Sequence, residues 1–197
     1  MIESGQEYRG RRFARVVATG ERYENVEFSD CNFDRCTFVQ CVFYRCLFIQ
    51  CKFSVCDLSG VQVPNSRFID VSFKGSKLTG IDWTQVGESA ISKLLVSLDC
   101  DECVLNYSSF FGMDLTGRSI TRCTAHETDF RDADLSGAVL TGTDFARALF
   151  HNTTLRNADL TGATNYAIDP TTNIVAKARF SLLEALSLLR GFEVVIE

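Results

Sequence analysis

Six cysteines recur at every fifth position near the start of the chain: Cys31, Cys36, Cys41, Cys46, Cys51 and Cys56. A further pair, Cys100 and Cys103, forms a C-x-x-C motif. Thiols in this number could hold a metal ion, form disulfides, carry out redox chemistry, or simply fill space in a core. The choice among these chemistries depends on how the rest of the chain positions the cysteines.

Each of the six evenly spaced cysteines stands two residues before a Phe or Leu, and this pair belongs to a longer five-residue repeat. We call the large apolar residue of each unit its centre. Centres follow every five residues from Phe28 to Trp83, and again from Leu105 to Leu160, and all of them are apolar. The residue two before a centre is usually small, and Gly often stands two after it.

A period of five fits neither an α-helix, at 3.6 residues, nor a long strand, at 2. The conflict disappears if the chain turns a corner every five residues, because the centre and the residue two before it then both point inward. Gly two after a centre would supply the positive φ that some corners need. The repeat therefore predicts a solenoid of short parallel strands around a core of centres.

The units "ADLSG" (133–137) and "ADLTG" (158–162) resemble the pentapeptide-repeat family, whose consensus is A(D/N)LXX. The resemblance implies an all-β solenoid, a right-handed quadrilateral β-helix with four units, or 20 residues, in each coil. The number of sides comes from the family and does not follow from the periodicity.

We divide the chain into five segments. They are an N-terminal cap with irregular first units (1–25), a first repeat run (26–83), a bulged coil or loop (84–103), a second repeat run (103–163), and a C-terminal helix and strand (164–197). Leu105 follows Trp83 by 22 residues, two more than one coil. Segment 84–103 is a candidate contact loop, and the alternative is a passive accommodation of this change of phase.

The C-terminal segment predicts a capped helix followed by a strand. Ser181 and Glu184 have the spacing of a capping box, Phe180 can pack on Ala185, and Gly191 is a suitable helix end. Residues 192–196 are typical of a short strand. Such a segment could cap the solenoid in a monomer, or, as the resemblance implies, join two monomers end to end. The predicted dimer interface consists of Phe180, Leu182, Leu183, Leu186, Leu189 and Phe192.

The coil arrangement argues against shared chemistry of the cysteines. Consecutive cysteines would lie on different walls, whereas a zinc ion needs four ligands at one point, about 2.3 Å away. We interpret them as small core residues, and Cys103 as another repeat position. His126 and His151 fall at outward positions, and no nucleophile, phosphate-loop or metal motif is present. We therefore predict no catalytic residue, no metal, no cofactor and no enzymatic activity, with a thiol-dependent metal or redox protein as the weakest alternative.

Charge is unevenly distributed along the chain. Residues 84–170 carry six basic against twelve acidic side chains, while the first 83 residues carry eleven against ten. Asp114 and Asp134 are 20 residues apart and should stack about 4.8 Å apart on one wall. The predicted partner-binding acidic face consists of Asp114, Glu127, Asp129, Asp132, Asp134, Asp144 and Asp159. The alternative is that Asp before a centre serves only the repeat and solubility.

Composition also limits the partners. A net charge of −5 argues against direct nucleic-acid binding, which uses basic patches. The N-terminus has no apolar signal sequence, and no apolar run approaches the roughly 18 residues of a membrane span. We expect a soluble cytoplasmic protein with reduced thiols.

The C-terminal pattern "NYAIDP…ARFSLLEALSLLRGFEVVI" resembles the topoisomerase-protecting branch of the family, which includes quinolone- and albicidin-resistance proteins. The resemblance implies a dimeric DNA mimic that binds DNA gyrase or another type II topoisomerase and relieves inhibition. The alternative is a structural or scaffolding solenoid that binds another protein.

Overall fold

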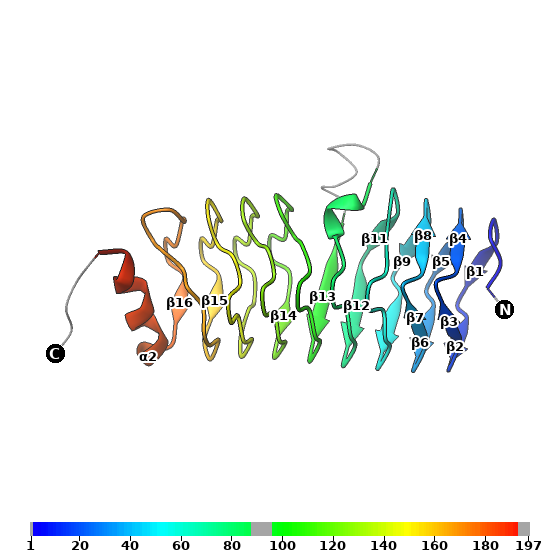
Figure 1. Ribbon diagram of the computed structural model, residues 1–197, viewed down its shortest axis with the longest axis horizontal. Coiled ribbons are helices and arrows are strands. Elements are labelled where there is room, and N and C mark those ends of the chain that lie inside the picture. Colours follow the sequence, from blue (N-terminus) through cyan, green and yellow to red (C-terminus); the bar gives the residue numbers. More distant parts are fainter. Residues whose placement is uncertain (1, 88–95, 193–197) are drawn as a thin grey trace.

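The computed structural model describes residues 2–87 and 96–192. They form a rod of stacked coils with the N-terminus at one end and a short helix at the other (Figure 1). Neighbouring coils pair as parallel strands, and the paired residues lie 20 positions apart, as for Phe28 beside Phe48 and Phe33 beside Phe53. Since each unit has five residues, a coil has four sides. The fold class that the resemblance implied, a four-sided β-solenoid with a short C-terminal helix, is confirmed.

Four walls run along the rod, and we number them in chain order. Wall 1 contains β1 (Glu7–Arg9), β5 (Glu27–Ser29), β9 (Leu47–Ile49) and β11 (Arg67–Ile69), and later the centres Leu115, Leu135 and Leu155. Wall 3 begins with β3 (Val17–Thr19) and β7 (Thr37–Val39). Wall 4 begins with β4 (Arg22–Glu24) and β8 (Val42–Tyr44) and continues to the 3-10 helix η1 (Trp83–Gln85). Beyond these strands, walls 3 and 4 continue as single bridging pairs.

Wall 2 is the most continuous. Its strands are β2 (Arg12–Ala14), β6 (Asn32–Asp34), β10 (Lys52–Ser54), β12 (Val71–Lys74), β13 (Leu98–Asp101), β14 (Ile120–Thr121), β15 (Asp159–Leu160) and β16 (Arg179–Phe180). From Phe13 to Phe180 it has nine levels, which at about 4.8 Å each gives a rod of roughly 40 Å.

The repeat begins earlier than we predicted, so the assignment of 1–25 to irregular first units is wrong. Strands β1 to β4 pair in register with β5 to β8. Tyr8, Phe13, Ala18 and Tyr23 occupy the centres of these units, in phase with Phe28. The less regular residue types around these centres hid the repeat, although the backbone keeps the same coil.

The centres form the core as columns of stacked rings in the first run. The ring centroids of Phe33 and Phe53 lie 4.4 Å apart and nearly parallel, and Phe48 lies 4.9 Å from Phe28 and 4.8 Å from Phe68. Rings of neighbouring walls meet edge to face, as Phe43 and Phe48 do at 5.4 Å. Both arrangements are favoured by the charge distribution of aromatic rings.

The six cysteines occupy small inward positions beside these rings, as predicted, and all are buried and free. Cys51 Sγ, for example, lies within weak hydrogen-bond distance of two backbone carbonyls, Phe28 O in the neighbouring coil (3.3 Å) and Ile49 O two residues earlier (3.4 Å). Ser66 occupies an equivalent position, where its Oγ donates to Phe43 O (2.7 Å) and accepts from Cys46 N (2.8 Å). Burial raises the pKa of the Cys46 thiol to about 11 and that of Cys51 to about 12, so both stay protonated at neutral pH.

The phase change between the two runs is larger than the two residues we predicted. Strand β12 pairs with β13 so that Phe73 lies beside Cys100, and Lys77 pairs with Val104. Paired residues here are 27 positions apart, so this coil contains seven additional residues, and Leu105 stacks on Leu78. Cys100 consequently takes the position of a large centre, while Cys103 takes a small inward position. Of the candidate contact loop 84–103, residues 88–95 lie outside the described residues.

The corners require a left-handed backbone far more often than glycine alone would suggest. The residue two after a centre has positive φ after every centre of both runs except Trp83, and at many corners it is Asn, Asp, Arg or Gln. Val55 (φ +56°) and Tyr107 (φ +61°) also adopt this conformation, which is unfavourable for β-branched and bulky side chains. The coil geometry therefore overrides local preference at these two positions.

The C-terminal segment forms α2 (Leu182–Ala185) and a 3-10 helix, η2 (Leu186–Phe192). The predicted capping box is wrong, because Ser181 makes no cap hydrogen bond. Ser181 Oγ instead accepts from Gly162 N (2.8 Å), and Glu184 Oε2 accepts from Asn165 N (3.3 Å). Both side chains thus attach the helix to the last coil. Of the predicted strand 192–196, Phe192 ends η2 and the remaining residues lie outside the described part.

Candidate partner-binding surface

The seven acidic residues predicted as one face are distributed around the rod. Asp114 and Asp134 lie on wall 1, Asp159 on wall 2, Asp144 on wall 3 and Asp129 on wall 4, while Glu127 and Asp132 occupy the corners before and after wall 4. The prediction selected residues that point outward, but it assigned residues from walls that face in different directions to a single face. The acidic residues therefore surround the second run and do not form one face.

Asp114, Asp132 and Asp134 differ from the rest of this set in their partners. Asp114 and Asp134 are directly paired on wall 1, and Asp132 occupies the adjoining corner. Within the described residues, none of the three makes an ion pair. Like charges at this spacing repel each other unless water or a cation meets them. We call these three residues the aspartate column.

The other four acidic residues have cationic or polar partners within the rod. Asp129 accepts two hydrogen bonds from the Arg131 side chain, at 2.7 and 2.9 Å, and these lower the pKa of its carboxyl. Glu127 pairs with Arg147 (2.6 Å), Asp159 with Arg179 (3.1 Å), and Asp144 with the ring of His126 (2.9 Å). Their charges are partly compensated before any partner arrives.

Aspartate before a centre also has a structural role. Its carboxylate accepts a hydrogen bond from the backbone N–H two residues later, as Asp114 does from Thr116 (2.9 Å) and Asp134 from Ser136 (2.8 Å). The same contact lowers the pKa of Asp159, whose main partner is Thr161. These Asx-type turns support the corners, so the purely structural explanation of these aspartates accounts for part of their occurrence.

The C-terminal helices leave a large apolar surface exposed at the end of the rod. Leu182 and Leu183 are 84% and 81% exposed, and Leu186, Leu189 and Phe192 are also exposed. Phe180 is half-buried, with its ring 5.7 Å from that of Tyr166. Five of the six predicted interface residues are thus available to a partner, and Phe180 belongs partly to the core.

Sequence reasoning missed an apolar group on the second run. Tyr107, Phe111 and Leu149 are exposed by 60%, 45% and 45%, at the corner before wall 4 and on wall 4 itself. All three stand at positions that the five-residue phase assigns to the outside. Large apolar residues at outward positions were the signal that could have identified them.

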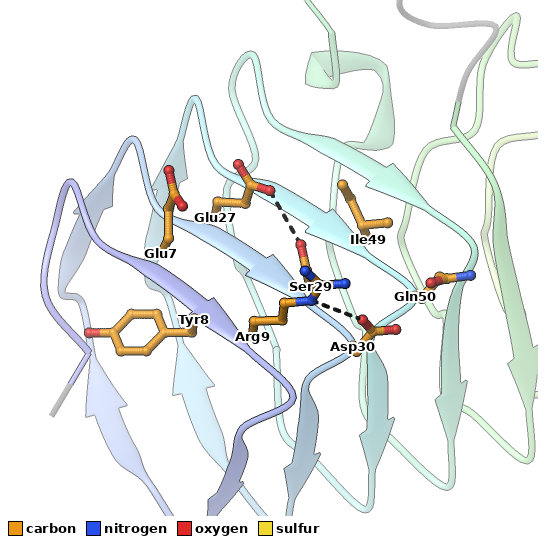
Figure 2. Close-up of a pocket in the computed structure, with 8 residues that line it drawn as sticks. All are labelled: Glu7, Tyr8, Arg9, Glu27, Ser29, Asp30, Ile49 and Gln50. Carbon is orange, nitrogen blue, oxygen red and sulfur yellow. Dashed lines mark hydrogen bonds and ion pairs between the residues drawn. The ribbon is translucent and has the colours of Figure 1, made fainter.

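A shallow pocket of about 350 Å³ lies on wall 1 of the first run, between β1, β5 and β9 (Figure 2). Glu7 and Glu27 stand side by side on its rim, and Arg9 reaches Asp30 at 3.8 Å. No group of three or more His, Cys, Asp or Glu side chains suited to a metal ion occurs in residues 2–87 and 96–192. Among the same residues, no helix is long and apolar enough to cross a membrane.

Comparison with known proteins identifies the repeat. A family model described as a pentapeptide repeat region matches residues 23–88, and one described as pentapeptide repeats (8 copies) matches residues 128–164. No curated protein matches the chain.

Solved structures of QnrB1, described as a plasmid-mediated fluoroquinolone resistance protein, are similar along the whole length. A trypsin-treated variant of QnrB1 is 21% identical with a TM-score of 0.54, and the match covers 99% of each chain. Full-length QnrB1 is 19% identical with a TM-score of 0.56, covering 95% of this chain and all of that one. At these identities, the likeness shows the fold.

Proposed function

Because the chain belongs to the pentapeptide-repeat family, we propose that it is a non-enzymatic mimic of duplex DNA. Its partner is DNA gyrase or a related type II topoisomerase, which it protects from inhibitors. The observation that carries this proposal is the likeness to QnrB1, a fluoroquinolone resistance protein, over 99% of both chains. The likeness includes the C-terminal segment as well as the repeats.

The rod offers a physical basis for such mimicry. Each strand of duplex DNA carries a phosphate about every 3.4 Å, and the paired Asp114 and Asp134 lie one coil, or about 4.8 Å, apart along the rod. A basic channel that attracts the phosphates of DNA would attract this column by the same long-range force. The proposed binding is therefore strongest at low salt, and it requires no catalytic residue.

We further propose that two copies join end to end through the exposed apolar surface of α2 and η2. An exposed surface with five large apolar side chains is typical of an interaction site. A dimer would double the length of the rod to roughly 80 Å. Light scattering should report a dimer for the wild type and a monomer for Leu183→Asp, and a monomeric wild type would contradict this proposal.

The decisive assay measures gyrase supercoiling and fluoroquinolone-stabilised DNA cleavage with the protein added. Wild type should reduce drug-stabilised cleavage, and the double variant Asp114→Asn with Asp134→Asn should be weaker. The matched control is Asp57→Asn with Asp82→Asn, because those aspartates accept the same backbone hydrogen bonds in the first run, both at 3.0 Å. No effect of wild type on either reaction would exclude the proposed function.

A scaffolding role is the second candidate, and one observation favours it. Asp129, Glu127 and Asp159 are paired with arginines of the rod, and Asp before a centre supports its own corner. If these aspartates serve only the coil, wild type and all Asn variants would behave alike in both assays.

A further inference from the structure

Wall 2 of the first run presents a row of basic side chains to the outside. Arg12 and Lys52 occupy the same outward position on this wall two coils apart, and Lys74 lies on the other side of its centre one coil further along. Arg15 and Arg35 stack in adjacent coils at the corner between wall 2 and wall 3. All five side chains are exposed. We call these five residues the basic stripe.

The positive charge of the stripe is only partly compensated within the rod. A single carboxylate, that of Asp34, lies 3.0 Å from Arg12 and 3.8 Å from Arg35. The Asp34 side chain is 23% exposed, whereas those of the two arginines are 71% and 60% exposed. Among residues 2–87 and 96–192, Arg15 and Lys52 make no ion pair. The cationic groups therefore remain open to an anion from outside.

The stripe ends where the second run begins. Lys74 lies beside Asp101 of the next coil (3.3 Å), and Arg122 contacts the same carboxylate. Asp99 and Glu102 stand at the outward and corner positions on either side of Asp101. The charge of wall 2 thus changes sign at this level, so the basic surface is confined to the first run.

The net charge of −5 is an average that conceals this surface. Residues 84–170 contain six basic and twelve acidic side chains, so most of the excess negative charge lies outside the first run. The outward and corner positions of wall 2 in the first run carry the five cations of the stripe against three carboxylates, those of Asp30, Asp34 and Asp70. Asp30 and Asp70 stand at the corner between wall 1 and wall 2, away from Arg15 and Arg35.

The residues between the cations favour a phosphate backbone over an acidic protein. Asn32, Ser54 and Ser72 occupy the other outward positions of the wall, and its one apolar outward residue is Ala14. Val55, at the adjoining corner, is the single exposed large apolar side chain of the stripe's surroundings on this wall. Protein interfaces have an apolar centre with aromatic or other large anchors. Contacts to phosphate oxygens instead use Arg, Lys, Ser and Asn, the types found here.

The dimensions of the stripe suit one strand of a duplex. From β2 to β12 the wall has four levels, and three steps of about 4.8 Å give a length of roughly 14 Å. Phosphates follow each other about every 3.4 Å along the axis of DNA, so the stripe spans about four base pairs. Each guanidinium group can hold a phosphate through two parallel hydrogen bonds.

We propose that the basic stripe binds the phosphate backbone of duplex DNA. The contact is with the backbone, so it does not depend on base sequence. This inference goes beyond the proposed function, because it concerns another wall and the other repeat run than the aspartate column and needs no topoisomerase. It departs from the absence of direct nucleic-acid binding that we predicted from the net charge.

The test titrates a short labelled DNA duplex with the full-length protein and follows fluorescence anisotropy over a range of salt concentrations. Wild type should bind at low salt, and its affinity should fall steeply as salt rises, because each phosphate contact releases counterions. Arg15→Gln with Lys52→Gln should bind about tenfold more weakly at low salt, for any base sequence. The slope of log affinity against log salt should become shallower by about two. The melting temperature should not change, because neither side chain has an ion pair to lose.

The matched control is Arg67→Gln with Arg156→Gln. Both arginines are exposed on wall 1 and make no ion pair among the residues that the structure describes, and the pair of substitutions changes the net charge by the same amount. This variant should bind DNA like wild type. Asp114→Asn with Asp134→Asn should bind DNA at least as tightly as wild type, because it removes negative charge from the rod.

Three results would overturn the inference. The first is no binding of the duplex by wild type at low salt. The second is equal weakening in the stripe variant and the control variant, which would show that net charge alone governs binding. The third is displacement of the DNA by polyglutamate at equal charge concentration, which would identify an acidic protein as the partner. Because the assay contains no topoisomerase, each of these results leaves the proposed function intact, and an inactive wild type in the gyrase assays would leave this inference intact.

Discussion

The two repeat runs build the same coil with different chemistry. In the first run, β5 to β10 are strands of three residues, and ring columns such as Phe28, Phe48 and Phe68 fill the core. In the second run, single bridges replace most strands, and many corners are closed by a hydrogen bond from the small inward residue to the preceding centre, as from Ala138 N to Leu135 O (3.0 Å).

This difference shows that a coil can be stabilised through its core or through its corners. Large rings hold the walls of the first run together, and its small positions contain cysteines. Closed corners with glycine and aspartate hold the second run, where the centres are often Leu and the small positions often Ala. The aspartate column belongs to the second run, so the acidic surface proposed for binding lies where the corners carry more of the stability.

The largest expected effect is the loss of a central ring. Phe48→Ala should lower the free energy of unfolding by about 4 kcal/mol, because it leaves a cavity and removes two stacked neighbours. Leu135→Ala, in the second run, should cost about 3 kcal/mol. Denaturant unfolding followed by the fluorescence of Trp83, the only tryptophan, measures both. A greater loss for Leu135→Ala would contradict the core-based account of the first run.

A corner substitution should have a smaller effect. Gly137 has φ +65°, and a Cβ there would meet no atom within 4 Å. The change in stability of Gly137→Ala therefore reports only the cost of placing alanine in a left-handed backbone conformation. It should lower the free energy of unfolding by about 1 kcal/mol. Gly137→Asn should cost less, because Asn tolerates this conformation. If calorimetry gives equal stabilities for wild type and Gly137→Ala, the corner conformation contributes less to the stability of the second run than we infer.

The cysteines should behave as packing residues. Cys46→Ala should cost about 1 kcal/mol through lost packing, and Cys46→Ser should retain the contact with the backbone that Ser66 makes one coil further along. Neither change should alter protection of gyrase. Zinc that co-purifies with wild type in stoichiometric amount and is lost in Cys46→Ala would contradict the packing interpretation.

The smallest effect concerns acid pH. Hydrogen bonds from Arg131 and Thr161 lower the pKa values of Asp129 and Asp159 in the folded state. The stability that they supply is therefore complete above the unfolded pKa, about 3.9, and is lost as the pH falls through the lower folded values. Melting temperatures between neutral pH and pH 2 should decline less steeply for Asp129→Asn than for wild type. Identical profiles would contradict this contribution.

Much of the fold could be predicted from the sequence, because the five-residue phase assigns every residue to the inside or the outside. The phase placed Phe48 in the core, Cys46 beside it and Asp134 outside. It failed where the coil tolerates atypical residues: Tyr8 and Phe13 continue the pattern in a segment predicted to be irregular. The seven additional residues before Leu105 were counted as two, because nothing in the sequence says that Leu105 stacks on Leu78.

The candidate site was harder to predict, because direction around the rod depends on which wall each unit occupies. Asp114 and Asp134 share a wall through their separation of 20, but Asp129, Asp144 and Asp159 lie on three others. The sequence also did not reveal the ion pairs of these acidic residues. Glu127 pairs with Arg147 because the two residues stand in adjacent coils, and this adjacency exists only in the folded rod. Tyr107 was overlooked because its corner position was assigned to polar residues and glycine.

Competition between this protein and linear duplex DNA for gyrase tests the central claim most directly. If the rod mimics DNA, increasing concentrations of wild type should displace labelled duplex DNA from gyrase, and Asp114→Asn with Asp134→Asn should displace it less effectively. Simultaneous binding of both, with no displacement at saturating protein, would contradict the account.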